Sequence, residues 1–109
     1  MIIPVYMFAF ADEGDRSMIR PVEIPTGEAE SARMVEGLLE LVFRYGQNEI
    51  QSKKFPSVSV GDVADINGRY FMALGTGWQE LTKDEFDNLK TPTSWYAYGF
   101  NAKKAIKKN

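Results

Sequence analysis

The chain has 109 residues, of which 44% are hydrophobic and 26% charged, and this length and composition predict one soluble domain over residues 1–109. It contains neither cysteine nor histidine, which excludes disulfides, thiolate nucleophiles, zinc sites built on those ligands, and the usual general base at neutral pH. The net charge of −2 conceals an asymmetry, because residues 1–50 hold nine acids and four bases whereas residues 51–109 hold six acids and nine bases.

Two strands are predicted at the N-terminus. Residues 2–10 are rich in β-branched and aromatic residues, and Pro4 places the start of this strand at an edge or at the end of its pairing. Residues 17–24 follow a turn at residues 12–15 and should pair antiparallel with the first strand. No Lys or Arg precedes the apolar run, which is also far shorter than the ~20 residues of a membrane span. We therefore expect a cytoplasmic protein.

Residues 27–45 predict one long helix. Thr26 can cap its first turn, and the acidic residues that follow suit the positive end of the helix dipole. Gly46 supplies a C-terminal stop, and a polar loop over residues 47–56 comes next. The helix is predicted from an apolar stripe at helical spacing, which comprises Ala32, Val35, Leu38, Leu39 and Val42.

A β-hairpin is predicted around Asn67-Gly68, because a type I′ turn needs positive φ at both central residues and this dipeptide tolerates it. Both faces of the hairpin are largely apolar, which predicts that it is covered on both sides. Gly61 indicates a bend before the hairpin, where Asp62 should accept hydrogen bonds from backbone amides. The two-residue loop predicts the opposed pairs Val63–Met72, Ala64–Phe71, Asp65–Tyr70 and Ile66–Arg69.

The last third of the chain predicts a short helix, a strand and a helical tail. A Thr-Lys-Asp-Glu sequence at residues 82–85 fits a capping box that opens the helix. Residues 94–100 predict an aromatic strand, and Asn101 can cap a helical tail over residues 102–108. The predicted class is α+β, with a small, mainly antiparallel sheet, curled or closed into a partly open barrel, packed on the long helix.

The middle of the chain resembles a known family. The residues that carry the resemblance are Ser57-Val58-Ser59-Val60-Gly61-Asp62-Val63, Gly68, Tyr70 and Gly77-Trp78, with Leu41-Val42-Phe43 and Asn48 upstream. This run is similar to the YodL-like domains of small phage and plasmid proteins and covers about residues 38–81. An arginine often precedes the first serine in that family, whereas this chain has Pro56. The resemblance implies a mobile-element protein in the cytoplasm of a bacterial host and carries no activity with it.

Two groups of carboxylates are candidate cation sites. The acidic turn at residues 12–15 lacks the twelve-residue ligand spacing of an EF-hand, so solvated turn residues are the favoured interpretation. Asp62, Asp65 and Glu80 could supply a magnesium site at a sheet edge, but bonds to backbone amides and neighbouring side chains explain them more simply. No Ser-His, Ser-x-x-Lys or Gly-x-Ser-x-Gly pattern is present for acyl transfer. We predict no enzymatic activity, no metal and no cofactor.

The first function hypothesis is a non-enzymatic module that binds a protein partner, with a basic host protein as one candidate. An acidic surface steers basic partners and speeds their encounter, although a solvated helix face is the simpler interpretation of the same residues. The residues assigned to this surface are Asp12, Glu13, Asp15, Glu28, Glu30, Glu36 and Glu40.

The second hypothesis is a nucleic-acid-binding accessory protein. Aromatic side chains would stack on bases and lysines would follow the phosphates. The competing interpretation is that the aromatic residues are core residues and that the lysines are solvated near a helix end. A monomer or a small homo-oligomer is expected under either hypothesis. The residues assigned to this second surface are Trp95, Tyr96, Tyr98, Lys103, Lys104, Lys107 and Lys108.

Overall fold

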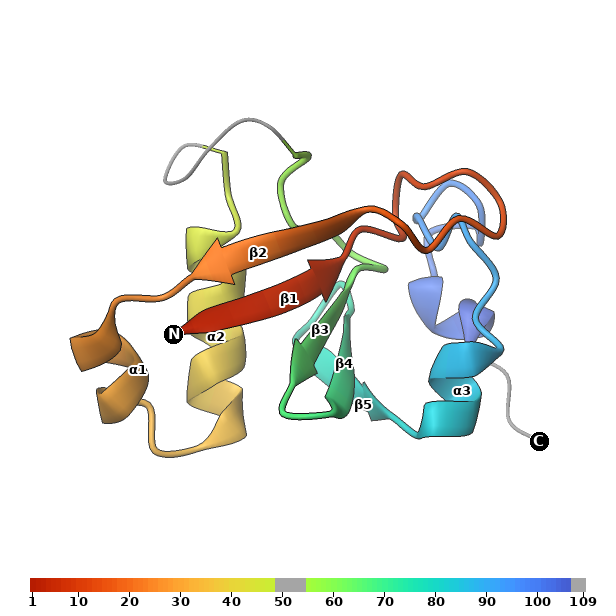
Figure 1. Ribbon diagram of the computed structural model, residues 1–109. Coiled ribbons are helices and arrows are strands. Elements are labelled where there is room, and N and C mark those ends of the chain that lie inside the picture. Colours follow the sequence, from red (N-terminus) through yellow and green to blue (C-terminus); the bar gives the residue numbers. More distant parts are fainter. Residues whose placement is uncertain (49–54, 107–109) are drawn as a thin grey trace.

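The computed structural model describes residues 1–48 and 55–106 and has an α+β fold (Figure 1). Within the described residues, five strands form one open sheet in the order β2-β1-β3-β4-β5, with every neighbouring pair antiparallel. The strands are β1 (Ile2–Tyr6), β2 (Ile19–Glu23), β3 (Val63–Ile66), β4 (Arg69–Ala73) and β5 (Trp78–Leu81). The predicted class and the antiparallel sheet are therefore confirmed, and the sheet is open.

The first two strands pair as predicted, although both are shorter than the sequence pattern suggested. Pro4 and Pro21 lie opposite each other, so two residues that cannot donate to the ladder share one position in it. After Tyr6 the chain leaves the sheet, because the N–H of Phe8 donates to the Tyr6 carbonyl at 3.0 Å. The carbonyl of Phe8 then accepts from the N–H of Thr93 at 3.0 Å, so Met7, Phe8 and Ala9 are buried outside the sheet, whereas Phe10 is exposed.

The prediction of one long helix is wrong, because the segment forms two helices, α1 (Thr26–Ser31) and α2 (Val35–Tyr45). Burial explains the break. No residue of α1 is buried and Ala29 alone packs partly on the first core, whereas α2 buries Leu39 and Val42, so the second half of the segment is held more firmly against the sheet. The apolar stripe therefore predicted α2 correctly, but the predicted helix began too far toward the N-terminus.

The chain at the break also depends on a glycine in α2. A Cβ at Gly37 would lie 3.3 Å from the Cβ of Ala32, so a side chain at residue 37 would crowd the segment that joins the two helices. Thr26 is not the cap that was predicted, since Pro25 holds the N-cap position of α1 and makes no side-chain cap. Part of the predicted loop at residues 47–56 lies outside the described residues.

Two apolar cores cover the two faces of the sheet, as the hairpin pattern predicted. Helix α2 lies on one face and packs closely on the edge strand β2, while α3 (Lys83–Asp87) and the 3₁₀ helix η1 (Ala102–Ala105) lie on the other (Figure 1). The first core comprises Ile3, Val5, Met7, Val22, Ile24, Leu39, Val42, Val58, Ala64, Ile66 and Phe71. The second comprises Phe8, Val63, Met72, Leu81, Phe86, Leu89, Ala102 and Ala105.

The local signals around β3, β4 and α3 are confirmed. All four predicted cross-strand pairs occur, and Asn67 and Gly68 have φ angles of 53° and 83°. The capping box of α3 is complete, because the Glu85 N–H donates to Thr82 Oγ1 at 3.1 Å and the Thr82 N–H donates to Glu85 Oε1 at 2.8 Å. These features depend on neighbours in sequence, which is why the pattern was sufficient to predict them.

The predicted strand at residues 94–100 does not form. This segment is a series of turns in which Gly99 and Phe100 have φ angles of 62° and 66°, values that no strand accommodates. Asn101 does cap the following element, since its Oδ1 accepts from the Lys103 N–H at 3.2 Å. That element is the short η1, and the remainder of the predicted tail, residues 107–109, lies outside the described residues.

Asp62 is fully buried where four segments meet. Its Oδ1 accepts from the Ala9 N–H at 2.9 Å and its Oδ2 from the Ser59 N–H at 2.8 Å, so the prediction that it binds backbone amides is confirmed. Beside it, Gly61 has a φ of 100°, and a Cβ there would lie 2.3 Å from the Thr93 carbonyl oxygen. Burial raises the pKa of Asp62 to about 7, against the opposing effect of the two backbone hydrogen bonds.

We predict that Gly68→Val destabilises the protein by about 1–3 kcal/mol, because a β-branched residue is strained at positive φ. No atom lies within 4 Å of the Cβ that the substitution adds, so backbone strain alone should cause the loss. Urea denaturation would measure it. Asn67→Gly is the matched control and should cost less, since glycine tolerates the same turn. Equal midpoints for Gly68→Val and wild type would contradict the turn assignment.

We predict that the Asp62 carboxyl titrates near pH 7, as measured by ¹³C NMR of the labelled side chain. Its pKa is higher in the folded protein than the ordinary 3.8, so the folded state binds the extra proton between these values. The stability that Asp62 contributes should therefore fall as the pH rises from about 4 to about 7, by on the order of 4 kcal/mol. Asp15 is the control, because its hydrogen bonds with Ser17 lower its pKa. An Asp62 midpoint below pH 4 would refute the prediction.

Candidate functional site

The three carboxylates considered for magnesium are not brought together. Asp62 is buried beneath the loops, Asp65 accepts from the Gly68 N–H at 2.8 Å in the hairpin turn, and Glu80 pairs with Arg69 on the surface. In residues 1–48 and 55–106, no group of three or more acidic side chains is arranged to hold a metal ion. Each carboxylate thus has a local partner of the kind that the sequence analysis favoured.

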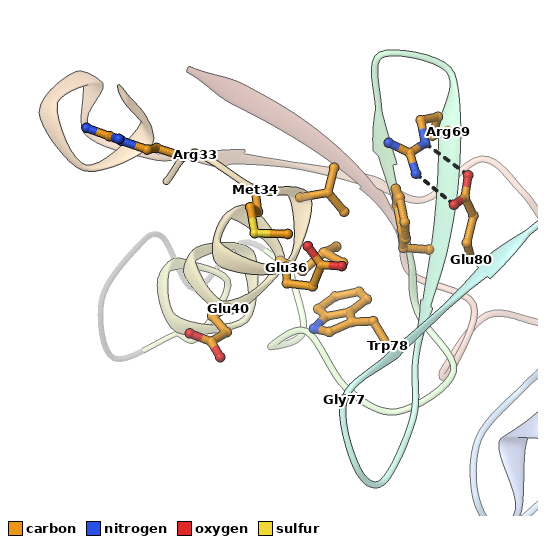
Figure 2. A pocket seen from close by; sticks show the side chains of 11 residues that line it. Arg33, Met34, Glu36, Glu40, Arg69, Gly77, Trp78 and Glu80 are labelled. Atoms are coloured by element: carbon orange, nitrogen blue, oxygen red, sulfur yellow. Dashed lines mark hydrogen bonds and ion pairs between the residues drawn. The ribbon is translucent and has the colours of Figure 1, made fainter. Parts of the chain in front are cut away.

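A groove of about 740 Å³ lies between the first half of α2 and the strands β4 and β5 (Figure 2). It exists because α2 packs toward β2, at the opposite edge of the sheet, and no helix of the described residues covers this face near β5. Leu39 and Phe71, both buried, form part of its floor. The side chain of Trp78, the first residue of β5, extends toward α2 (Figure 2). Met34, with 68% of its surface exposed, lies at the N-terminal end of α2.

The rim of the groove carries charges of both signs, but some of them are already paired with each other and others can interact with a bound partner. Arg69 and Glu80 form a bidentate pair, with Nε–Oε2 and Nη2–Oε1 distances of 3.0 and 2.8 Å, and the Arg69 guanidinium also lies 5.2 Å from the Phe71 ring centre. Their hydrogen bonds raise the pKa of Arg69 and lower that of Glu80, which keeps both groups ionised. Glu36 and Glu40 are exposed, and neither forms an ion pair within the described part of the chain.

The structure divides the predicted acidic surface into three places. Glu36 and Glu40 line the groove, one helical turn apart on α2. Glu28 and Glu30 lie on α1, where Glu28 accepts a short hydrogen bond from the Tyr45 hydroxyl. The remaining acids, at residues 12–15, sit beside the segment that follows α3, because the Thr91 hydroxyl donates to the Asp12 carbonyl at 3.0 Å. Only the α2 pair is therefore joined to an apolar recess.

A second candidate surface is formed by exposed aromatic side chains at the opposite end of the molecule from α1. Trp95 and Tyr96 both approach Phe100, with ring centres 6.0 and 5.9 Å apart, and the positive φ of Phe100 projects this ring from the turn. A depression of about 290 Å³ separates these rings from Phe10, and the exposed fractions range from 37% for Trp95 to 86% for Tyr96. We call Phe10, Trp95, Tyr96 and Phe100 the aromatic surface.

The residues assigned to nucleic-acid binding are only partly collected at this surface. Tyr98 is half-buried against the second core, and its hydroxyl donates to the Lys90 carbonyl at 3.3 Å. Lys103 lines an adjoining depression with Trp95 and Phe100, and Lys104 is exposed beside it on η1. Lys107 and Lys108 lie outside the described residues. The structure thus brings together two of the three predicted aromatic residues, with Lys103 and Lys104 nearby.

Sequence reasoning missed several residues of both surfaces. The prediction placed Met34 within one long helix. In the structure it is the N-cap of α2 and lines the groove, because the helix is broken there. Phe10 was assigned to a strand that in fact ends at Tyr6. Trp78 carried a usable signal, since a large aromatic residue directly after the Gly75-Thr76-Gly77 turn favours the start of a strand, and β5 begins there.

Comparisons of this chain with protein-family models, with curated proteins and with solved structures find no match. Among residues 1–48 and 55–106, no helix has the length and apolar character required to cross a membrane.

Proposed function

We propose that this protein is a non-enzymatic interaction module that binds a partner protein in the groove between α2 and β5. The main support for this proposal is that the groove combines an apolar floor open to solvent with two exposed carboxylates on its rim. A tryptophan and a methionine line the same recess. Tryptophan is enriched among the residues that dominate binding energy, and methionine adapts its shape to a bound surface.

The chemistry of the groove favours binding over catalysis. Its one closely paired set of ionisable groups, Arg69 and Glu80, is engaged in a bidentate ion pair on the surface. Glu36 and Glu40 are exposed, whereas a carboxylate acting as a general base near neutral pH normally needs a desolvated setting. Exposed rim carboxylates instead suit the long-range attraction of a basic partner.

The genetic setting that the YodL-like resemblance implies adds to this proposal. Trp78 belongs to the run that carries the resemblance, and it also lines the groove. We propose that the protein is an accessory factor of a phage or another mobile element and that it modulates a basic host protein in the bacterial cytoplasm.

The two acids of α2 provide a direct test. We predict that Glu36→Lys/Glu40→Lys weakens binding to the cognate partner at least tenfold, because it reverses the only acids of the predicted set that line the groove. The partner would be recovered from bacterial lysate with the wild-type protein, purified, and titrated calorimetrically against each variant. Glu13→Lys/Glu30→Lys is the matched control, since it changes the net charge equally at exposed residues away from the groove. Equal affinity for both double variants would refute the assignment of the groove.

A second candidate function is binding of single-stranded nucleic acid at the aromatic surface. The observation that favours it is the exposure of four aromatic rings around one depression, with Lys103 and Lys104 nearby. Rings of this kind stack on bases in a sequence-tolerant way, and adjacent lysines contact the phosphates. The overall acidity of the chain, with a net charge of −2, counts against a strong interaction.

If nucleic acid binds there, fluorescein-labelled single-stranded DNA or RNA should show micromolar affinity that falls steeply between about 50 and 200 mM salt. Trp95→Ala and Tyr96→Ala should each cost about 1–3 kcal/mol of binding free energy. Fluorescence anisotropy would measure both effects. Trp78→Ala is the matched control, because it removes a tryptophan from the groove instead. No anisotropy change at low salt would eliminate this second function.

A further inference from the structure

The strand beside the groove has an open edge. β5 is the last strand in the sheet order, and it pairs with β4 on one side. In the part of the chain that the structure describes, no strand pairs with its other side, and none of the loop and turn hydrogen bonds engages Trp78 or Glu80. An open edge of this kind presents N–H and C=O groups that a further strand can bind.

The pairing with β4 determines which backbone groups of β5 face outward. The Leu74 N–H donates to the Gly77 carbonyl at 2.9 Å, so these opposed residues form a hydrogen-bonded pair. Hydrogen-bonded and non-hydrogen-bonded pairs alternate along an antiparallel ladder. Gln79 and Leu81 therefore bond to β4, whereas the N–H and C=O groups of Trp78 and Glu80 point away from the sheet.

The same two residues direct their side chains toward the groove. Glu80 lies opposite Phe71, a member of the first core, and Trp78 lies opposite Ala73 on the same face of the sheet. Both Trp78 and Glu80 line the groove (Figure 2). Because side chains alternate along a strand, a chain bound at this edge would place every second side chain over the groove.

We propose that the groove binds an extended segment of a partner protein, which adds to β5 as a further antiparallel or parallel strand and whose groove-facing side chains, every second one, include both apolar and basic residues. This inference rests on the proposed function and specifies how the partner binds. The outward groups of Trp78 and Glu80 supply up to two donors and two acceptors for the added strand. Its apolar side chains cover Trp78 and Met34, since these line the recess.

Charge complementarity selects basic residues in the added segment. The acids Glu36 and Glu40 face the groove from α2, without an ion-pair partner in the described residues. Of the two arginines that line it, Arg69 is held by Glu80, and Figure 2 shows Arg33 directed away from Trp78. Lysine or arginine side chains on the segment reach α2 across the recess, whereas acidic segments are repelled.

The experiment uses a yeast-displayed library of random ten-residue peptides, selected on the full-length protein. Enriched peptides should carry both apolar residues and lysine or arginine among every second position, the positions that face the groove. One enriched peptide is then synthesised and titrated against Glu80→Ala and Glu80→Pro. Both variants lose the ion pair with Arg69, but only proline also removes the outward N–H of residue 80. We expect the proline variant to bind at least tenfold more weakly than the alanine variant.

A second measurement does not depend on the proline variant folding. Backbone N-methylation of the same peptide, one residue at a time, should weaken binding to the wild-type protein at least tenfold at alternate positions and little at the others. Uniform tolerance of N-methylation would overturn strand addition, and so would enrichment of acidic or helical peptides or failure to enrich any peptide. The proposed function fails separately, if Glu36→Lys/Glu40→Lys leaves binding to the cognate partner unchanged.

Discussion

The buried carboxyl of Asp62 is the interaction on which the arrangement of the loops depends. It binds the backbone N–H groups of Ala9, in the segment after β1, and of Ser59, in the segment before β3. Its own carbonyl accepts from the Ala73 N–H at 2.9 Å at the end of β4. Gly61 beside it accepts a buried hydrogen bond of 2.6 Å from the Thr93 hydroxyl. One position thereby fixes the exits of β1 and β4 and the return of the C-terminal segment.

This anchoring also determines which part of the sheet is left open. The C-terminal segment, once held at Gly61, covers one face of the sheet together with α3. On the other face, within the described residues, the main helix is α2, which lies against β2. One helix cannot span a twisted sheet of five strands, and the uncovered region falls at β4 and β5. The groove is therefore a consequence of having a helix on one side of that face and none on the other.

The two candidate surfaces differ in the physics by which they would bind. The groove combines an apolar recess, exposed carboxylates and free backbone groups at one edge of the sheet. The aromatic surface offers flat rings with few polar groups between them, held by turns with positive φ. A groove with several kinds of complementary group discriminates among partners better than stacking alone, which accepts any planar group.

The sequence by itself determined the features that depend on near neighbours. The Asn67-Gly68 hairpin with its register, the Thr82–Glu85 capping box and the bond from the Ser59 amide to Asp62 were all predictable, because turn chemistry and caps act over a few residues. Only the tertiary structure decided the break between α1 and α2 and the turns at residues 94–100. In both segments local propensity favoured a regular element, but burial against the sheet set its actual extent. The groove also could not be predicted from the sequence. It depends on where α2 lies relative to β5, and no spacing in the chain encodes that distance.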